Sequence, residues 1–235
     1  MPATPHASGP LQGISSMATR LVLAELAAAH RQQGGAAVDW LSIGGVDAAR
    51  RVAAGDAFDL VVLAADAIDK LIAGGQVLAG SRVDLVRSGV AVAVPAGAPL
   101  PDLHSEEAVR QAVLAAPTLG YSTGPSGVAL AALFQRWGIA GLIAPRIQTP
   151  PPGVPVGQWI AEGRIALGFQ QRSELIHVAG IQIAGALPPA IQIDTVFSAG
   201  ICRTAAQPEA ARALIQFMAS PAADDAKRRQ GMAPA

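Results

Sequence analysis

Small polar residues follow four predicted strands of this chain, and their types suit them to bind a small anion. They are Ser15, Ser16, Gly44, Gly45, Ser122, Thr123, Ser126, Gly127 and Gln171. Three of the four segments precede a predicted helix, whose first N–H groups lack intrahelical partners and bind oxyanions without a cation. Neighbouring hydroxyls add further donors. Serine and glycine are also ordinary turn and cap residues, so the anion-binding interpretation rests on the four segments taken together.

Arg87 is the cation that we single out as a candidate ligand contact. It lies just before residues 90–94, where valine alternates with small residues as in a strand. If that strand begins at a cleft, the guanidinium can pair bidentately with a ligand carboxylate. The alternative is a solvated surface arginine. Arg172, which directly follows Gln170 and Gln171, is a second but weaker candidate for such a contact.

Signals of catalysis, metal binding and cofactor binding are weak in this sequence. Residues 124–128 read GPSGV, so Val128 stands where the nucleophile motif G-x-S-x-G has its last glycine. The four histidines are dispersed and show no metal-ligand spacing. Neither a G-x-G-x-x-G motif nor a Walker A loop occurs. We therefore expect no cofactor and no metal site.

The composition disfavours several classes of partner. Lysine plus arginine and aspartate plus glutamate both total 17 in 235 residues, so the net charge is zero, whereas a nucleic-acid-binding protein usually has a basic excess. A membrane-spanning helix needs about 20 apolar residues in a row, and no such run is visible. We expect neither a nucleic-acid partner nor membrane insertion. Residues 1–13 show no pattern of a secretory signal, which leaves a cytoplasmic location open.

Predicted strands and helices alternate along the chain, which is typical of α/β architecture with a largely parallel sheet. Residues 11–15 form a weak first strand. Residues 38–66 read as strand, glycine loop, helix and strand, a right-handed parallel unit. Asp66 is predicted to cap the next helix through its side chain. In such sheets the loops after the strands open on one edge, and ligands bind there.

Five segments in a fixed order carry a family resemblance. They are the Ser-Ser loop, IGGVDAARRVAAGDAFDLVVLAADAIDKLIAGG, SRVDLVRSGVAVAVPAGAP, GFQQRSEL and PEAARALIQFMASPAADDAKRRQGM. From about Leu11 to its C-terminus, the sequence resembles the molybdate-binding, ModA-like branch of type II periplasmic solute-binding proteins. The resemblance implies two α/β lobes joined by crossing strands near residues 86–94 and 193–198, with a ligand captured between them. Lobe one would contain residues 11–86 and 194–235, and lobe two residues 87–193.

The resemblance also implies ligand contacts for some residues of this chain. Ser15 or Ser16 matches the family's first-loop serine, and Ser126 and Gly127 stand where backbone amides contact the oxyanion. The second loop departs from the family, because residues 44–46 are Gly-Gly-Val where another serine is usual.

Gln171 is a second departure, since the family has a tyrosine at its position. The loss of a hydroxyl and a phenol predicts weak or absent molybdate binding. A bacterial aconitate isomerase resembles the same group of proteins, which brings organic polycarboxylates into consideration as ligands.

Three functions follow as hypotheses. The leading one is a periplasmic solute-binding protein that closes on a small anion, an oxyanion or an organic carboxylate, and delivers it to an ABC importer. The second is a cofactor-independent isomerase that acts on a tricarboxylate such as aconitate by proton transfer. The third is a regulatory ligand sensor. The expected partners are the small anionic ligand and an ABC permease, and the chain itself is expected to be a monomer.

Overall fold

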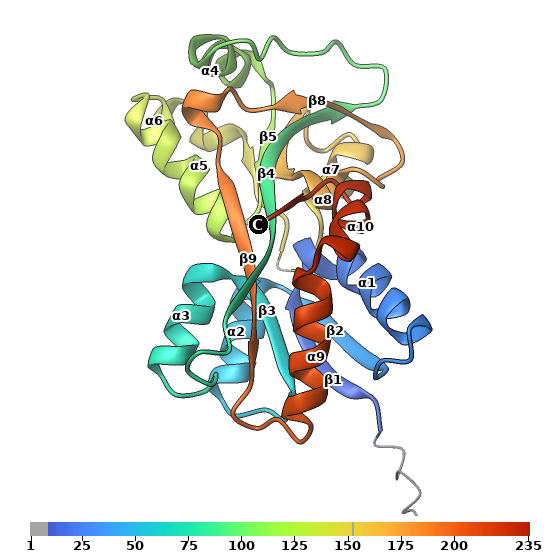
Figure 1. Ribbon diagram of the computed structural model, residues 1–235. Coiled ribbons are helices and arrows are strands. Elements are labelled where there is room, and N and C mark those ends of the chain that lie inside the picture. Colours follow the sequence, from blue (N-terminus) through green and yellow to red (C-terminus); the bar gives the residue numbers. More distant parts are fainter. Residues whose placement is uncertain (1–8, 152) are drawn as a thin grey trace, which may run out of the picture.

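The computed structural model describes residues 9–151 and 153–235. Most of the leader segment considered above, residues 1–8, therefore lies outside the described residues. Figure 1 shows an upper and a lower half connected by two long strands, β4 (Val83–Pro95) and β9 (Asp194–Ile201), which run from one half into the other. The C-terminal strand β10 (Ala233–Pro234) pairs with β4 at this crossing. The fold is α/β, as the sequence predicts, but the sheet is mixed and not largely parallel, because the crossing strands β4 and β9 pair antiparallel with their neighbours.

Strands and helices alternate along most of the chain. The other strands are β1 (Leu11–Ser16), β2 (Val38–Ile43), β3 (Leu60–Ala64), β5 (Leu119–Tyr121), β6 (Ile147–Gln148), β7 (Leu167–Gln171) and β8 (Ile181–Ala186). The α-helices are α1 (Arg20–Gln32), α2 (Gly45–Ala53), α3 (Ala65–Ala73), α4 (Glu106–Ala115), α5 (Pro125–Arg136), α6 (Ala140–Ile143), α7 (Val156–Ala161), α8 (Arg172–Leu175), α9 (Pro208–Ala219) and α10 (Asp224–Arg229). Short 3-10 turns are η1 (Met17–Thr19), η2 (Ala144–Arg146), η3 (Pro189–Ile191) and η4 (Pro221–Ala223).

The strand order is β2-β1-β3-β9-β4-β7-β5-β6, and β8 and β10 also pair with β4. In the lower half β1 runs parallel to β2 and β3. In the upper half β5 runs parallel to β6 and β7. The crossing strands β4 and β9 are antiparallel to each other. Because parallel strands end at the same edge of a sheet, the loops after β1, β2 and β3 lie together, and so do those after β5 and β7.

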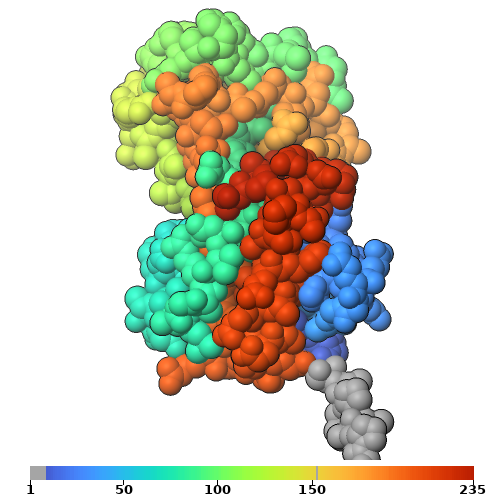
Figure 2. Space-filling model, in the orientation of Figure 1, coloured from blue at the N-terminus to red at the C-terminus, as the bar shows by residue number. Residues whose placement is uncertain are grey.

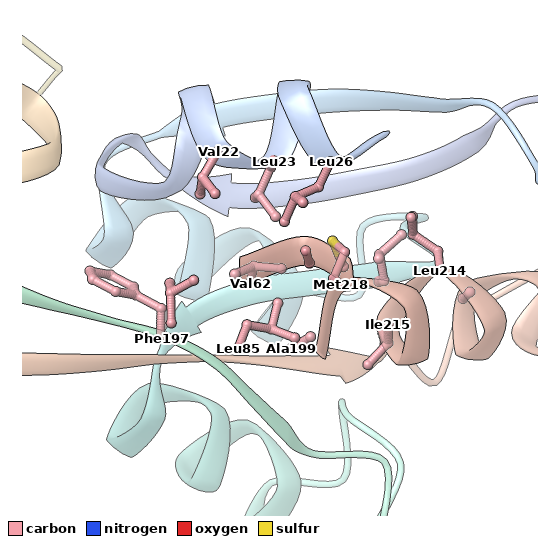
Figure 3. Packing of buried hydrophobic residues seen from close by; sticks show 14 of the residues in the cluster. Val22, Leu23, Leu26, Val62, Leu85, Phe197, Ala199, Leu214, Ile215 and Met218 are labelled. Carbon is pink, nitrogen blue, oxygen red and sulfur yellow. The ribbon is translucent and has the colours of Figure 1, made fainter. Parts of the chain in front are cut away.

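One hydrophobic core of the lower half lies between the sheet and helices α1 and α9. Figure 3 shows how side chains from these two helices meet those of β3, β4 and β9. The labelled side chains are Val22, Leu23, Leu26, Val62, Leu85, Phe197, Ala199, Leu214, Ile215 and Met218. On the opposite face of the sheet, α2 and α3 pack around Ile14 and Val61. All five residues of β3 are buried, because helices cover both faces of this sheet.

Two further cores fill the upper half. Val90, Val92 and Val94 belong to the core that includes residues of α4 and α5. Ala91 and Ala93, between them in sequence, belong to the core of α7 and α8. Since successive side chains of a strand point to opposite faces, this arrangement confirms the strand predicted for residues 90–94. The four described clusters of the two halves share no residue.

One local prediction was wrong. Asp66 does not cap α3, because the helix begins at Ala65 directly after β3, and Asp66 lies in its first turn with Lys70 Nζ 3.5 Å away. The strand predicted over residues 11–15 is confirmed, and β1 lies between β2 and β3 in the sheet. Among the described residues, no single helix combines the length and apolarity of a membrane span, and α5 with residues 140–146 does so only as a pair bent by 116°.

Candidate functional site

Ser15 and Ser16 end β1 beside the start of α2. Ser15 Oγ lies 2.9 Å from Ser42 Oγ on the neighbouring strand β2. Gly44 precedes α2, and a Cβ atom built on Gly45 would lie 3.5 Å from Ser16 Cβ. Ser15 and Ser16 are both buried, and Ser16 Oγ has no hydrogen-bond partner among the described residues. The structure therefore brings these four predicted residues together at one edge of the lower sheet.

Gln171 lies where the upper half meets β9. Its Nε2 donates to Thr195 Oγ1 at 2.8 Å, whereas its Oε1 is buried without a partner in the described part of the chain. Thr195 stands opposite Ser88 in the pairing of β9 with β4, so these two side chains share a face. Ser88 Oγ is also buried and finds no acceptor or donor within the described ranges. Rotating the amide of Gln171 would exchange its donor and acceptor, so the end not bonded to Thr195 can serve as either.

Helix α8 brings another hydroxyl toward the first loop. It begins directly after Gln171 and contacts η1, the turn that follows Ser16. Ser173 of α8 is buried, and its Oγ has no partner among residues 9–151 and 153–235. Four of the five buried side-chain atoms that lack a partner in the described residues thus lie where the two halves meet. We call this group, on Ser16, Ser88, Gln171 and Ser173, the junction site.

The loop after β5 and the start of α5 hold the other residues predicted to bind an anion, which are Ser122, Thr123, Ser126 and Gly127. Strand β5 ends beside β7 in their parallel pairing, so the loop emerges near the end of β7. Ser126 and Gly127 are buried in the first turn of α5, Ser122 is half-buried, and Thr123 is exposed. A Cβ atom on Gly127 would overlap the carbonyl oxygen of Ser122, so this close approach of the loop to the helix requires glycine.

Neutral groups dominate the junction site, which consists of hydroxyls and a carboxamide. The helices α2 and α5 begin at the adjoining loop ends, and their first N–H groups have no intrahelical acceptor. The helix dipole adds partial positive charge at these ends. Such a set of groups holds an anion by hydrogen bonds instead of ion pairs. Within the described residues, no three His, Cys, Asp or Glu side chains gather as they would around a metal ion.

Glu174 follows the junction-site residue Ser173 on α8 and is titratable. It is half-buried, and burial raises the pKa of its carboxyl to about 7, although a side-chain hydrogen bond with Gln170 lowers the pKa in part. Gln170 Oε1 in turn accepts a hydrogen bond from Gly157 N at 3.2 Å. A carboxyl with a pKa near 7 can release and regain a proton at neutral pH.

Arg87 does not join the junction site. Ser88 is buried on the face of β4 that it shares with Thr195, whereas the preceding Arg87 is exposed and points to the other face. Arg87 instead lines a separate pocket of about 320 Å³ together with Arg172 and Asp194. The structure therefore separates the predicted arginine from the predicted serines, because neighbouring residues of a strand point apart.

Four side chains of this region were not chosen from the sequence. They are Ser42, Ser88, Ser173 and Thr195. Ser42 and Ser88 adjoin predicted residues, and Thr195 interrupts an otherwise mostly apolar strand, which was the available signal. Which face of β4 each side chain occupies is visible only once the pairing with β9 is known.

Comparison with known proteins identifies the family of this chain. Residues 11–233 match the family of bacterial extracellular solute-binding proteins. The chain belongs to this family. One family relative is an aconitate isomerase from a Pseudomonas species, which is 40% identical over 185 residues, covering 78% of this chain and 70% of the isomerase. The family assignment confirms the resemblance drawn from the sequence.

Solved structures of solute-binding proteins share this fold. The periplasmic molybdate-binding protein of Azotobacter vinelandii superposes with a TM-score of 0.79 at 22% identity, over 94% of this chain and 98% of that protein. A tungstate-binding protein from Desulfovibrio alaskensis superposes with a TM-score of 0.65 at 18% identity, over 93% of each chain. At these identities the comparison shows the fold, which agrees with the solute-binding family.

Proposed function

We propose that this solute-binding protein captures a small anion between its two halves and delivers it to an ABC permease in the periplasm. The observation that carries the proposal is the junction site, with four buried polar atoms that lack partners in the described residues. Leaving such an atom unpaired costs about 1–3 kcal/mol, so the site is suited to a molecule that supplies the partners. Its residues come from both halves and from a crossing strand, so one bound molecule can contact all three.

We further propose that the halves are lobes that move about the crossing strands. Lobe one comprises residues 11–86 and 194–235, and lobe two comprises residues 87–193. The separate hydrophobic cores support this division, because β4 passes from a core that includes Val86 to one that begins at Val90. We expect the lobes to act as one monomeric unit, with the ligand at the junction site.

An organic carboxylate is favoured over molybdate as the ligand. Val46 and Gln171 provide no hydroxyl where the ModA-like branch has a serine and a tyrosine. The 40% identity to an aconitate isomerase also favours a carboxylate. In its present orientation Gln171 Oε1 would accept a hydrogen bond from a hydroxyl or a protonated carboxyl group of such a ligand.

A thermal-shift panel tests the proposed function. The panel contains molybdate, tungstate, sulfate, citrate, cis-aconitate and trans-aconitate. A ligand present at a hundredfold excess over its Kd adds about 2.7 kcal/mol to the free energy of unfolding, which raises the melting temperature. We expect a rise with at least one organic carboxylate. An unchanged melting temperature with all six anions contradicts the proposal.

A second function, isomerisation of a tricarboxylate, is favoured by the 40% identity to an aconitate isomerase, and Glu174, which follows Ser173 on α8, is the candidate base. In the ionised form its carboxylate would take a proton from a methylene carbon of the ligand. The double bond then shifts, and the carboxyl returns the proton to the former alkene carbon. This exchange needs no oxidant and no cofactor. The pKa of about 7 for Glu174 suits both proton transfers near neutral pH.

Conversion of cis-aconitate to trans-aconitate, followed by chromatography, tests this second function. Acid–base catalysis contributes about 10²–10⁴-fold to rate, so we expect Glu174→Gln to lose at least that lower factor in kcat. Glu209→Gln is the matched control, because Glu209 is an exposed glutamate on α9. The isomerase function is refuted if the wild-type protein produces no trans-aconitate.

A further inference from the structure

A pocket lies on the face of the crossing strands opposite the junction site. Its volume is about 320 Å³, and its polar lining consists of Arg87, Arg172, Gln192 and Asp194. Gly89 stands opposite Asp194 in the pairing of β4 with β9, one step along from Ser88 and Thr195. The side chains around this pocket therefore point away from the junction site. We call it the hinge pocket.

The charged groups of the hinge pocket are not neutralised by one another. Arg87 and Arg172 form no ion pair with a carboxylate of the described residues, and Asp194 has no cation within ion-pair distance in the same ranges. Two positive charges and one negative charge thus face one pocket with their hydrogen-bonding groups available.

Two glycines shape the hinge pocket. A Cβ atom built on Gly89 would lie 2.9 Å from Asp194 Oδ1 and 3.0 Å from Gln192 Nε2, so the polar ends of both side chains lie over the backbone of this glycine. Gly231 has a φ of +72°, and a Cβ atom there would lie 3.3 Å from Arg172 Cγ. The small residues therefore let polar groups approach the floor of the pocket.

We propose that the hinge pocket binds a small dicarboxylate that also carries a hydroxyl or ammonium group. Two guanidinium groups from different elements, β4 and α8, suit two carboxylates, because the planar fork of arginine matches a carboxylate bidentately. The carboxylate of Asp194 then accepts a hydrogen bond from the hydroxyl or ammonium group. The pocket volume lies at the lower end of the range for small-molecule sites, which suits a ligand of about four to six carbon atoms.

The position of the hinge pocket also couples it to the junction site. Its walls come from the crossing strand β4, from α8 of the upper half, and from the C-terminal segment, which lies across the meeting of the two halves in Figure 2. A ligand held by all three changes the freedom of the halves to move. A ligand in the hinge pocket and a ligand at the junction site then change each other's affinity by the same factor. This coupling rests on the proposed function, whereas binding to the pocket does not.

Calorimetric titration of the full chain with malate tests the hinge pocket. The titration is done in a Ser16→Ala background, so that the junction site is impaired. We expect saturable binding of one malate, weakened at least tenfold by Arg87→Gln and by Arg172→Gln. Arg110→Gln, which replaces a half-buried arginine of α4 that pairs with Glu107, is the matched control and should stay within twofold. Acetate, which has a single carboxylate, should bind at least tenfold more weakly than malate.

Three results would overturn the proposal: no binding of malate, affinities within twofold in both pocket variants, or acetate binding as tightly as malate. Circular dichroism of each variant establishes that the fold is retained. None of these results bears on anion binding at the junction site, which the comparison of wild type with Ser16→Ala measures separately.

Discussion

Ser15 and Ser16 are neighbours in sequence, but their hydroxyl groups have different surroundings. Ser15 Oγ is bonded to Ser42 Oγ, so it fixes the ends of two strands relative to each other. Ser16 Oγ is buried without a partner in the described residues, so it is available to a ligand. Arg87 and Ser88 differ in the same way, because they point to opposite faces of one strand. At the scale of the residue, the partner of each polar group decides whether it supports the fold or can bind a ligand.

Glu174 gives a prediction about pH and stability. Its carboxyl has an ordinary pKa of 4.5 and a folded-state pKa of about 7, so the folded state holds the proton more tightly. The contribution of Glu174 to the free energy of unfolding therefore falls as the pH rises from about 4.5 to about 7. Glu174→Gln has no carboxyl at this position, so its free energy of unfolding does not fall for this reason as the pH rises. At about 1.4 kcal/mol per pKa unit, we expect the variant to gain about 1–3 kcal/mol relative to wild type between pH 5 and pH 8.

Urea unfolding at these two pH values measures the effect, with Glu209→Gln as the exposed control. The same pH dependence in wild type and Glu174→Gln would show that this carboxyl is not the one that titrates near neutral pH.

Weak molybdate binding is the second prediction at this scale. Val46 has no hydroxyl, Gln171 replaces a tyrosine, and Ser42 Oγ already has Ser15 Oγ as its partner. A hydrogen bond to a charged group contributes about 1.5–3 kcal/mol, so two missing donors weaken binding by about two to four powers of ten. Calorimetry that finds a Kd near 1 μM, about −8.2 kcal/mol, or tighter would contradict this expectation.

At the scale of the element, the crossing strands and the helix starts position the junction site. Strand β4 contributes Ser88, and β9 contributes Thr195, which holds Gln171 at the end of β7 by a hydrogen bond of 2.8 Å. The sequence predicted a strand over residues 90–94 and the loops after β1, β2, β5 and β7, because the spacing of apolar residues is a local property, whereas the crossing of two strands between the halves was implied by the family resemblance.

The faces of these strands were not predictable from the sequence. The pairing of β4 with β9 sets Ser88 opposite Thr195, and a shift by one residue would exchange the two faces of a strand. For this reason the sequence alone favours Arg87 as a ligand contact and gives no signal for Ser88. Ser173 was missed because α8 is only one turn long and gives no periodic signal.

Gly127 gives a prediction at the scale of the element. Gly127→Ala places a Cβ atom against the carbonyl oxygen of Ser122, so either the loop or α5 must shift. Overpacking of this kind costs about 1–3 kcal/mol, and we expect a loss of this size in the free energy of unfolding. Gly141→Ala on α6 is the matched control, because nothing lies within 4 Å of its added Cβ atom. Equal effects of the two substitutions in urea unfolding would contradict the proposed close approach.

At the scale of the whole molecule, two separately packed halves are joined by strands and a few side-chain contacts. His177 Nε2 lies 2.9 Å from Gln230 Oε1, and Gln230 Nε2 donates to Glu25 at 2.7 Å, so one chain of hydrogen bonds links the upper half to α10 and α1. Because the clusters of the two halves share no residue, we expect the halves to move relative to each other without exposing these clusters. The proposed function uses this freedom to close on a ligand.

Closure gives a prediction for small-angle X-ray scattering. Saturation with the carboxylate that most raises the melting temperature should reduce the radius of gyration of the wild-type protein, because the halves approach each other around the ligand. Ser16→Ala should need at least ten times as much ligand for the same reduction. A radius of gyration that does not respond to a bound ligand would argue against lobes that move.

The most direct test of an anion at the junction site is calorimetric titration with that same carboxylate. Ser16→Ala removes a hydroxyl from the site, and Ser81→Ala removes one bonded to the backbone N–H of Ile201, at the opposite end of the lower sheet. We predict one ligand per chain, binding at least tenfold weaker in Ser16→Ala, since the lost bond is worth about 1.5–3 kcal/mol, and unchanged affinity in Ser81→Ala. Equal affinities in wild type and Ser16→Ala would contradict the account.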